Sequence, residues 1–366
     1  MNLNKKQTKV INVTNSYLPP IDEYIYFLRK IWDSNHLTNH GPLVKELEEK
    51  VKSYLDINHL CFVNNGTLAL QIAIKALDLK KEIITTPFSY VATTSSIVWE
   101  NCTPVFADIE VDTLTIDVKK IEPLINKNTE AILATHVYGN PCNIDEIERL
   151  ALKYNLKVIY DGAHSFGVKF KKKALLEYGD ISTLSFHATK LFHTVEGGAL
   201  ITKSEDIFHK ISYLMNFGHK GKEDFFGIGI NAKNSEFHAA MGLCNIKYIT
   251  QIIESRKKIT ELYDHLLLNK KLYKPRLRDD TEYNYSYYPI IFENEISLLK
   301  AQENLNNNNI FPRRYFYPSL NKLNYVKKQN TPISEDISKR ILCLPLYSEL
   351  NKNDIKKIAE IILKSI

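Results

Sequence analysis

The chain has 366 residues, of which 44% are hydrophobic and 25% charged, a composition typical of a globular protein with a large core and not of a disordered chain. Its formal net charge of +6 is spread along the sequence without a long basic run, which favours anionic small molecules over nucleic acid as ligands. The first residues lack an apolar signal core, and no apolar stretch is long enough to cross a bilayer, so we expect a cytoplasmic protein with no membrane partner.

Five cysteines are far apart in the chain and form no CxxC pair. This arrangement favours reduced thiols in a reducing compartment over a disulfide framework. The ligand spacing of a zinc site is also missing, and we expect no bound metal. The cysteines are Cys61, Cys102, Cys142, Cys244 and Cys343.

The start of the chain is predicted to be helical, with apolar residues at helical spacing over residues 21–32 and 43–55. From residue 59 onward, short apolar runs alternate with helical patterns. This alternation predicts an α/β fold with a mostly parallel central sheet covered by helices, and ligands at the carboxyl ends of its strands. The expected strands are residues 60–63, 83–86, 105–108, 131–136, 158–161, 181–186 and 199–202, with helices starting at Thr67, Ser89 and Ile144.

The pattern changes near residue 248, and the elements that follow indicate a compact α+β unit. We therefore expect a large domain of residues 1–247 and a smaller C-terminal domain of residues 248–366. The elements expected in the smaller domain are a long helix at 248–268, a tyrosine-rich strand at 283–292, a helix from Ile296, a polar turn at 306–309 and a closing helix from Asp354.

Three places in the large domain carry candidate functional residues. Gly66 and Thr67 lie between a predicted strand and its helix, where backbone amides can bind a phosphate, although a helix N-cap formed by Thr67 is the alternative. Asp161 ends a buried strand and is placed to hold a positively charged ring nitrogen, although a capping aspartate gives a similar pattern. Lys190 lies between two predicted strands, where a solvated loop lysine is the alternative.

Together these features match what pyridoxal 5'-phosphate requires of a protein: a phosphate site, an acid that keeps the ring nitrogen protonated, and an amine that forms the Schiff base. Five segments of the chain resemble the DegT/StrS-type nucleotide-sugar aminotransferases, and the resemblance covers nearly the whole sequence. It implies a fold-type I, pyridoxal-phosphate-dependent homodimer with shared active sites. The segments are residues 65–70, 86–93, 136–141, 161–164 and 185–190.

The resemblance also implies roles for individual residues. Lys190 is similar to the Schiff-base lysine, which moves the proton between cofactor and substrate once it is released. Asp161 resembles the partner of the pyridinium nitrogen, and Asn231 resembles an asparagine that reaches the phosphate from the other subunit. The remaining matches are Gly66, Thr67 and Ser185 for the phosphate and Tyr90 for stacking on the cofactor ring.

Two residues depart from the family pattern. His164 stands where most members carry a glutamine that faces the phenolic oxygen of the cofactor. A histidine can also donate to that oxygen, and its own protonation would then tune the Schiff base. Lys233 stands where tyrosine or arginine is usual, so its contacts are open. A related dehydrating branch has histidine in place of the lysine, and Lys190 argues against that reaction.

The segments at residues 185–190 and 313–318 are similar to those of enzymes that use L-glutamate and dTDP-linked keto-6-deoxyhexoses. The resemblance implies amino transfer to a keto carbon, with a 4-keto sugar favoured over a 3-keto sugar and pyridoxamine phosphate as the intermediate cofactor form. The product would serve surface polysaccharide or glycoconjugate biosynthesis, such as the O-antigen of lipopolysaccharide. His187, Arg313 and Tyr317 are expected to hold the diphosphate or the sugar, and an edge strand is the alternative for the arginine-rich run.

A non-catalytic binding or regulatory protein with this fold is the second hypothesis. It explains less well why both a proton-moving lysine and an electron-accepting ring site are present. Glu196 has no chemical role in either hypothesis. Gly197 and Gly198 are expected to permit a tight return into the following strand.

Overall fold

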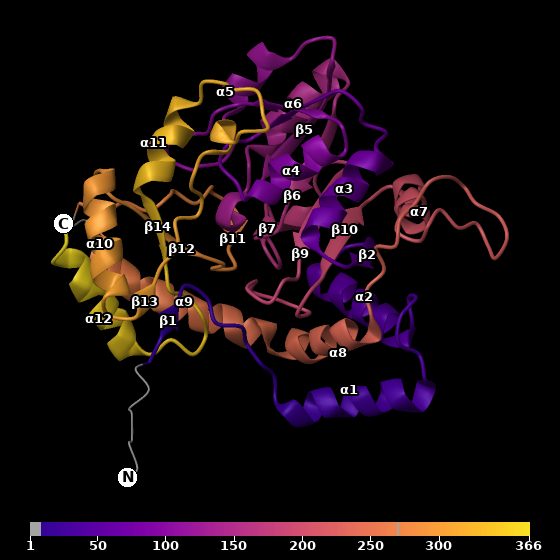
Figure 1. Cartoon of the computed structure of the whole chain (residues 1–366), viewed down its shortest axis with the longest axis horizontal. Helices are drawn as coiled ribbons and strands as arrows, with labels where there is room; N and C mark the ends of the chain where they lie inside the picture. The colour runs from indigo at the N-terminus through magenta and orange to yellow at the C-terminus, as the bar shows by residue number, and fades with distance from the viewer. Residues whose placement is uncertain (1–8, 269–270) are drawn as a thin grey trace.

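The computed structural model describes residues 9–268 and 271–366. Its centre is a seven-stranded sheet with the strand order β2-β10-β9-β6-β5-β3-β4 (Figure 1). Neighbouring strands are parallel, except that β10 runs antiparallel to both β2 and β9. The mostly parallel sheet predicted from the sequence is therefore confirmed. The strands are β2 (His59–Val63), β3 (Glu82–Thr85), β4 (Thr103–Phe106), β5 (Thr129–Thr135), β6 (Lys157–Asp161), β9 (Ile181–Ser185) and β10 (Gly198–Thr202).

The antiparallel direction of β10 follows from its connection to β9. Residues 186–197 contain no helix, whereas a parallel return normally needs a crossover of roughly a dozen residues or more, usually helical. At the start of β10, a Cβ atom on Gly198 would lie 2.5 Å from the carbonyl carbon of Asn65. Glycine therefore lets this strand enter the sheet against the turn at Asn65, as expected for the tight return.

The central sheet is buried on both faces, which explains the uninterrupted apolar runs in the sequence. In β2, Leu60 and Phe62 pack with α2 (Pro42–Leu55) and α8 (Glu236–Asn245), whereas Cys61 faces the opposite layer. The layer on that opposite face includes α3 and α7. The remaining helices of this part are α3 (Gly66–Ala76), α4 (Val91–Trp99), α5 (Val118–Ile121), α6 (Ile144–Tyr154) and α7 (Glu205–Leu214).

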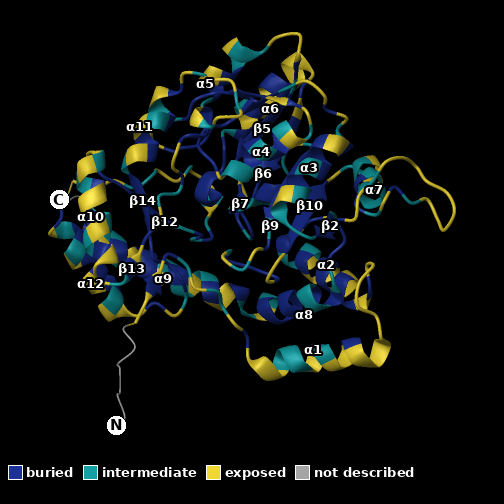
Figure 2. Cartoon of the chain, viewed as in Figure 1, coloured by how far each residue is buried: buried dark blue, intermediate teal, exposed yellow. Residues whose placement is uncertain are grey.

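The helix α1 (Ile21–Ser34) lies along the outer side of α8, at the margin of the molecule (Figure 1). Its inner side chains Phe27 and Ile31 join the core, whereas Tyr26 and Trp32 are exposed, and Figure 2 shows this helix with much of its surface uncovered. Within the described residues, no helix combines the length and the apolar character needed to cross a membrane.

The C-terminal part has its own buried cluster, packed around α9 (Ile249–Leu267). This helix confirms the long helix expected there. The strand β1 (Ile11–Asn12) pairs with β13 (Ile310–Phe311), and Ile11 packs in the same cluster, so the start of the described chain is tied to the C-terminal part. The division at residue 247 stays a prediction. The other helices are α10 (Glu295–Asn306), α11 (Pro332–Arg340) and α12 (Lys352–Leu363).

The tyrosine-rich strand expected at residues 283–292 is wrong in its first half. Only Tyr288–Ile291 forms a strand, β12, which pairs antiparallel with β14 (Ile341–Leu344). The preceding residues leave the sheet because the side chains of Asn284 and Ser286 bind backbone carbonyls of the loop after β6. A three-stranded sheet of β11 (Thr281–Glu282), β7 (Lys169–Phe170) and β8 (Lys173–Ala174) lies next to this segment.

Candidate active site

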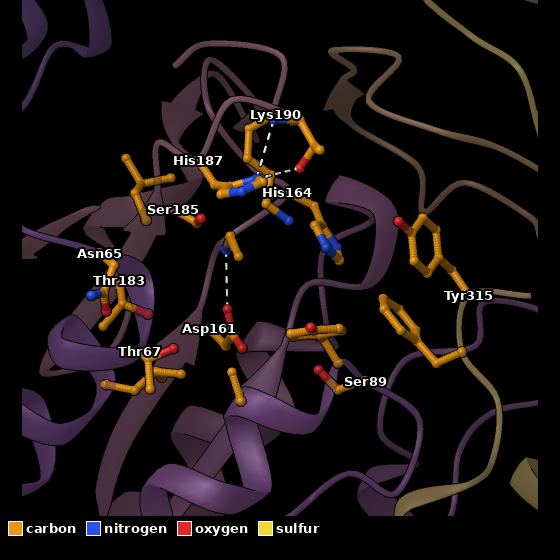
Figure 3. Close-up of a pocket in the computed structure, with 18 of the residues that line it drawn as sticks. Asn65, Thr67, Ser89, Asp161, His164, Thr183, Ser185, His187, Lys190 and Tyr315 are labelled. Atoms are coloured by element: carbon orange, nitrogen blue, oxygen red, sulfur yellow. Dashed lines mark hydrogen bonds between the residues drawn. The ribbon is translucent and has the colours of Figure 1, made fainter. Parts of the chain in front are cut away.

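A cavity of about 390 Å³ lies at the carboxyl ends of β6 and β9, beside the N-terminus of α3 (Figure 3). Side chains from the C-terminal part, among them Tyr287 and Tyr315, close one side of it. The sequence-predicted residues that line this cavity are Gly66, Thr67, Tyr90, Asp161, His164, Ser185, His187, Lys190 and Arg313. The structure therefore brings together residues that are far apart in the chain, as a parallel sheet does at its carboxyl edge.

The turn before α3 forms a tight cradle. Asn65 caps the helix, because its Oδ1 accepts a hydrogen bond of 2.8 Å from the backbone N–H of Leu68. The alternative in which Thr67 is the N-cap is therefore wrong. A Cβ atom on Gly66 would lie 2.9 Å from Cβ of Ser185, so the absence of a side chain lets the helix start lie directly against the end of β9. Backbone amides at such a helix start attract an anion.

Asp161 is buried at the end of β6 and is held by two hydrogen bonds. Thr93 Oγ1 donates to its Oδ2 at 2.7 Å, and the backbone N–H of Ala163 donates to its Oδ1 at 3.1 Å. Burial raises the pKa of Asp161, and these two bonds and the charge of Lys190 act against that rise. Its oxygens form no ion pair among the described residues, so a cation entering the cavity would find an uncompensated carboxylate.

Behind Asp161 the hydrogen bonds continue through buried hydroxyl groups. The Thr93 hydroxyl has one proton and gives it to Asp161, so at the 2.7 Å contact between Thr93 and Ser89 the serine is the donor. Thr135 in turn donates to Ser89 at 3.1 Å. The three O–H dipoles therefore point in one direction, from Thr135 toward the carboxylate, and each strengthens the next.

Lys190 is half-buried, and its Nζ donates to Tyr287 Oη at 3.4 Å. Burial lowers the pKa of Lys190, while the nearby Asp161, Tyr315 and Tyr90 raise it to a smaller extent. A lower pKa leaves a larger fraction of the amine uncharged, which is the form that attacks a carbonyl carbon. The alternative of a freely solvated loop lysine does not agree with this environment.

His164 is buried, and a backbone contact sets which of its ring nitrogens carries the proton. Its Nδ1 accepts a hydrogen bond of 3.1 Å from the backbone N–H of Tyr138, so in the neutral ring the proton lies on Nε2. Burial and the charge of Lys190 hold the pKa of His164 well below its usual range. The idea that protonation of His164 tunes the site is therefore not supported; the ring is a neutral donor through Nε2.

The loop after β9 carries a second histidine at the cavity wall. His187 Nδ1 lies 2.8 Å from Thr189 Oγ1 and accepts from the backbone N–H of Thr189 at 3.2 Å. In the neutral ring Nε2 therefore carries the N–H, and this atom is 3.6 Å from Oε1 of Glu196. Glu196, to which the sequence assigned no role, lines the same cavity. A carboxylate here can accept hydrogen bonds from a bound hydroxyl or amine.

Arg313 lines the cavity and forms no ion pair among the described residues. Its backbone forms an isolated β-bridge to Cys343. The alternative prediction, that the arginine-rich run is an edge strand, is therefore met at Arg313 alone. Tyr317 does not line the cavity: its side chain is exposed, and its ring centroid lies 3.7 Å from the guanidinium carbon of Arg314. The expectation that Tyr317 holds the substrate is therefore not met in the single chain.

Asn231 also lies outside the cavity. It pairs with Asn216 at the base of the exposed loop of residues 216–231, which projects beyond α7 (Figures 1 and 2). Its Oδ1 accepts from Lys233 Nζ at 2.9 Å, and Lys233 itself is buried, which lowers its pKa. Within one chain these two residues contact each other and not the cavity.

Sequence reasoning missed the aromatic wall of the site. The rings of Tyr287 and Phe316 lie against His164, with centroid distances of 4.8 and 5.8 Å. Tyr315 packs edge-on against Tyr287 at 5.7 Å. The signal that could have found Tyr287 is the density of tyrosines around residues 283–288, which is unusual for a plain edge strand. Tyr315 and Phe316 lie in the run at 313–318, next to Arg313, and were passed over in favour of Tyr317.

These residues fit pyridoxal phosphate. The Gly66 turn and Ser185 form a close cradle of the kind that holds a phosphate, and Asp161 offers a buried carboxylate without an ionic partner. His164 supplies a neutral N–H donor, and Lys190 supplies an amine of lowered pKa on the same cavity. Figure 3 shows these side chains around one hollow.

Comparison with known proteins agrees with this site. A profile of the DegT/DnrJ/EryC1/StrS aminotransferase family matches residues 21–363. The chain is 39% identical to a dTDP-4-amino-4,6-dideoxy-D-glucose transaminase of Shigella dysenteriae, over 97% of this chain and 98% of that protein. It is 40% identical to the Escherichia coli protein of the same name, with the same coverage.

A solved structure of DesI in the presence of its TDP-sugar product superposes with a TM-score of 0.92, at 28% identity, over 97% of this chain and 92% of that one. This likeness confirms the predicted fold-type I architecture. The family profile covers the cavity residues and both parts of the chain. The chain belongs to the DegT/DnrJ/EryC1/StrS aminotransferase family.

Proposed function

We propose that this aminotransferase moves an amino group from L-glutamate to carbon 4 of a dTDP-linked 4-keto-6-deoxyhexose. The reaction class follows from the family, and the cofactor is pyridoxal phosphate. The sugar rests on the two relatives named for dTDP-4-amino-4,6-dideoxy-D-glucose. The observation in the site that carries the proposal is the half-buried Lys190 amine, which shares one cavity with Asp161 and the Gly66 turn.

The bound cofactor supplies an aldehyde that reacts with amines and a ring that accepts an electron pair. The amides at the start of α3 and the Ser185 hydroxyl would bind its phosphate. Asp161 would keep the proton on the ring nitrogen, and the Thr93 bond helps the carboxylate to stay ionised. His164 would donate from Nε2 to the phenolic oxygen, because its Nδ1 is occupied by the backbone N–H of Tyr138. Lys190, as a free amine, would take the proton from the glutamate carbon and return it on the cofactor side, and would move a proton in the opposite direction when the keto sugar is the acceptor.

The sugar and its diphosphate are proposed to contact the open side of the cavity. Arg313 has no carboxylate partner among the described residues and is free to pair with a phosphate oxygen. His187 and Glu196 present an N–H donor and a carboxylate at the same wall for sugar hydroxyl groups. A 3-keto sugar is the alternative substrate, and the 4-amino position in the names of both relatives favours the 4-keto sugar.

We also propose that two copies share their active sites. Asn231 does not reach the cavity of its own chain, and the loop beside it exposes a group of apolar side chains of the kind that a second copy covers. The exposed apolar side chains of this loop are Phe217, Phe225, Phe226, Ile228 and Ile230.

The enzyme is proposed to act in the cytoplasm, in agreement with its buried free thiols. Its product is proposed to serve surface polysaccharide or glycoconjugate biosynthesis.

The reaction is tested with Lys190→Ala. The unsubstituted protein loaded with pyridoxal phosphate should lose its long-wavelength absorbance on addition of L-glutamate, release 2-oxoglutarate, and then convert a dTDP-4-keto sugar to a product that mass spectrometry identifies as the amine. Lys190→Ala should show none of these three changes. A panel with 3-keto sugars compares the two substrates. Turnover by Lys190→Ala, or binding of the sugar by the unsubstituted protein without any amine product, would refute the proposal.

Shared sites are tested by complementation. Lys190→Ala and Asn231→Ala are each expected to be inactive alone. When the two variants are co-expressed, a mixed dimer carries one site with both side chains intact, so about a quarter of the sites should regain activity. If co-expression restores nothing while mixed dimers are present by mass spectrometry, Asn231 does not act across the subunits.

A further inference from the structure

Among the residues that the structure describes, Tyr287 is the one whose side chain forms a hydrogen bond with the Lys190 amine. The two atoms Lys190 Nζ and Tyr287 Oη are 3.4 Å apart, although the residues are 97 positions apart in the chain. The tyrosine ring stands edge-on to His164, with a centroid distance of 4.8 Å, and also to Tyr315, at 5.7 Å. The contacts with these two rings and the hydrogen bond to Lys190 give the hydroxyl group of Tyr287 a defined position beside the amine.

The backbone before Tyr287 is anchored to the large domain. Asn284 Nδ2 donates to the carbonyls of His164 and Phe166, both at 2.9 Å, and Ser286 Oγ donates to the His164 carbonyl at 2.8 Å. From the other side, the buried Arg256 of α9 donates to the Ser286 carbonyl at 3.1 Å. Three hydrogen bonds therefore fix the segment that carries Tyr287 to the loop that carries His164, and a fourth fixes it to α9.

Several charged or titratable groups face the Lys190 amine, and most of them do not touch it. Asp161 acts on it through its charge, as do Tyr90 and Tyr315 in their ionised forms. His164 is neutral. Burial raises the pKa of Tyr287 far above neutrality, so its hydroxyl keeps its proton and cannot act as the base. It remains able to accept an N–H bond through its oxygen or to donate its own O–H.

We propose that Tyr287 is a catalytic residue that stabilises the Lys190 amine in its protonated form during proton transfer. The inference rests on the proposed aminotransferase reaction. When Lys190 Nζ takes a proton from a substrate carbon, one of the three N–H groups of the ammonium donates to Tyr287 Oη, and the tyrosine keeps its own proton. Hydrogen bonds to charged groups are stronger than those to neutral ones, so the contact favours the ammonium over the free amine.

The first test uses cofactor-free protein, so that its outcome does not depend on the reaction. The rate at which Lys190 is acylated by a trace of labelled acetic anhydride is followed against pH by peptide mass spectrometry. In Tyr287→Phe the ring remains and the hydroxyl is lost, so the labelling profile should move to lower pH and the rate on its rising part should increase several-fold, up to about ten-fold. An unchanged profile would overturn the proposal.

The matched control is Tyr285→Phe, two residues earlier in the same segment, because Tyr285 does not line the cavity. It should leave the Lys190 profile unchanged, and an equal change in both variants would mean that the segment has merely moved.

The second test uses protein with cofactor bound. Tyr287→Phe should slow the glutamate half-reaction on the order of ten- to a hundred-fold, while the absorbance spectrum of the bound cofactor before glutamate is added stays the same as in the unsubstituted protein. Failure of the unsubstituted protein to bind cofactor would instead refute the proposed function and leave the labelling result valid.

Discussion

Replacing Thr93 with valine removes the hydroxyl that donates to Asp161 at 2.7 Å while changing the side-chain volume little. Thr93 is fully buried on α4, so water cannot replace the lost donor. Asp161 then keeps a single backbone bond, from Ala163. Ser89 also loses the acceptor for its own proton. The change therefore acts on the carboxylate and leaves the cavity wall in place.

The magnitude follows from the kind of bond that is lost. A hydrogen bond to a charged group contributes about 1.5–3 kcal/mol, which corresponds to roughly a ten- to hundred-fold change in an equilibrium constant at 1.36 kcal/mol per factor of ten. The bond favours only the ionised form of Asp161, so its loss raises the pKa of that carboxyl further. The affinity for pyridoxal phosphate should therefore fall most at acidic pH and least at alkaline pH, where the carboxylate stays ionised.

The assay is a titration of cofactor-free protein with pyridoxal phosphate at pH 5.5, 7 and 8.5, followed by absorbance. The chain offers a matched control in the next residue, because Thr94 is also fully buried and its hydroxyl has no partner among the described residues. Thr94→Val should leave cofactor affinity unchanged at every pH. Equal affinities for Thr93→Val and the unsubstituted protein at pH 5.5 would refute the reasoning about the hydroxyl chain.

Three further predictions concern the same cavity. Burial raises the pKa of Asp161 above the unfolded value of 3.8, so the folded chain is most stable while this carboxyl is protonated, and that stability is lost as the pH rises through the folded pKa. An asparagine at this position does not ionise. The difference in stability between Asp161→Asn and the unsubstituted cofactor-free protein, measured by thermal unfolding, should therefore favour the variant more at pH 7 than at pH 4. Gly66→Ala places a methyl group 2.9 Å from Cβ of Ser185 and should cost about 1–3 kcal/mol of unfolding free energy in a denaturant titration. His164→Gln keeps a neutral donor, so the absorbance of the bound cofactor should have the same pH dependence between pH 6 and 8 as in the unsubstituted enzyme; a titration present only with histidine would contradict the neutral ring inferred from the Tyr138 contact.

Local sequence was sufficient where a property depends on neighbouring residues. The apolar run that ends in Asp161 predicted both a buried strand and a carboxylate at its end, and β6 (Lys157–Asp161) has this arrangement. Gly66 before a helical pattern likewise predicted a close turn. These features are readable because strand period, helix start and glycine geometry are set within a few residues.

Sequence reasoning failed where two distant segments compete for the same backbone. The expected strand at residues 283–292 is shortened to Tyr288–Ile291 because Asn284 and Ser286 bind the loop after β6. The direction of β10 also escaped prediction, since an apolar run is the same for a parallel and an antiparallel strand. The N-cap of α3 is Asn65 and not Thr67. Several neighbouring residues are polar and could each cap a helix, so the sequence alone does not decide which of them does.

The sequence by itself determined the α/β class, the order of the elements and the identity of the chemical groups Asp161 and Lys190. Only the tertiary structure decided the state of those groups. Thr93 reaches Asp161 across 68 residues and Tyr287 reaches Lys190 across 97, and the backbone of Tyr138 fixes the proton position on His164. A pKa depends on burial and on the nearest polar atoms, and these are set by how the segments pack and not by the residues adjacent in the chain.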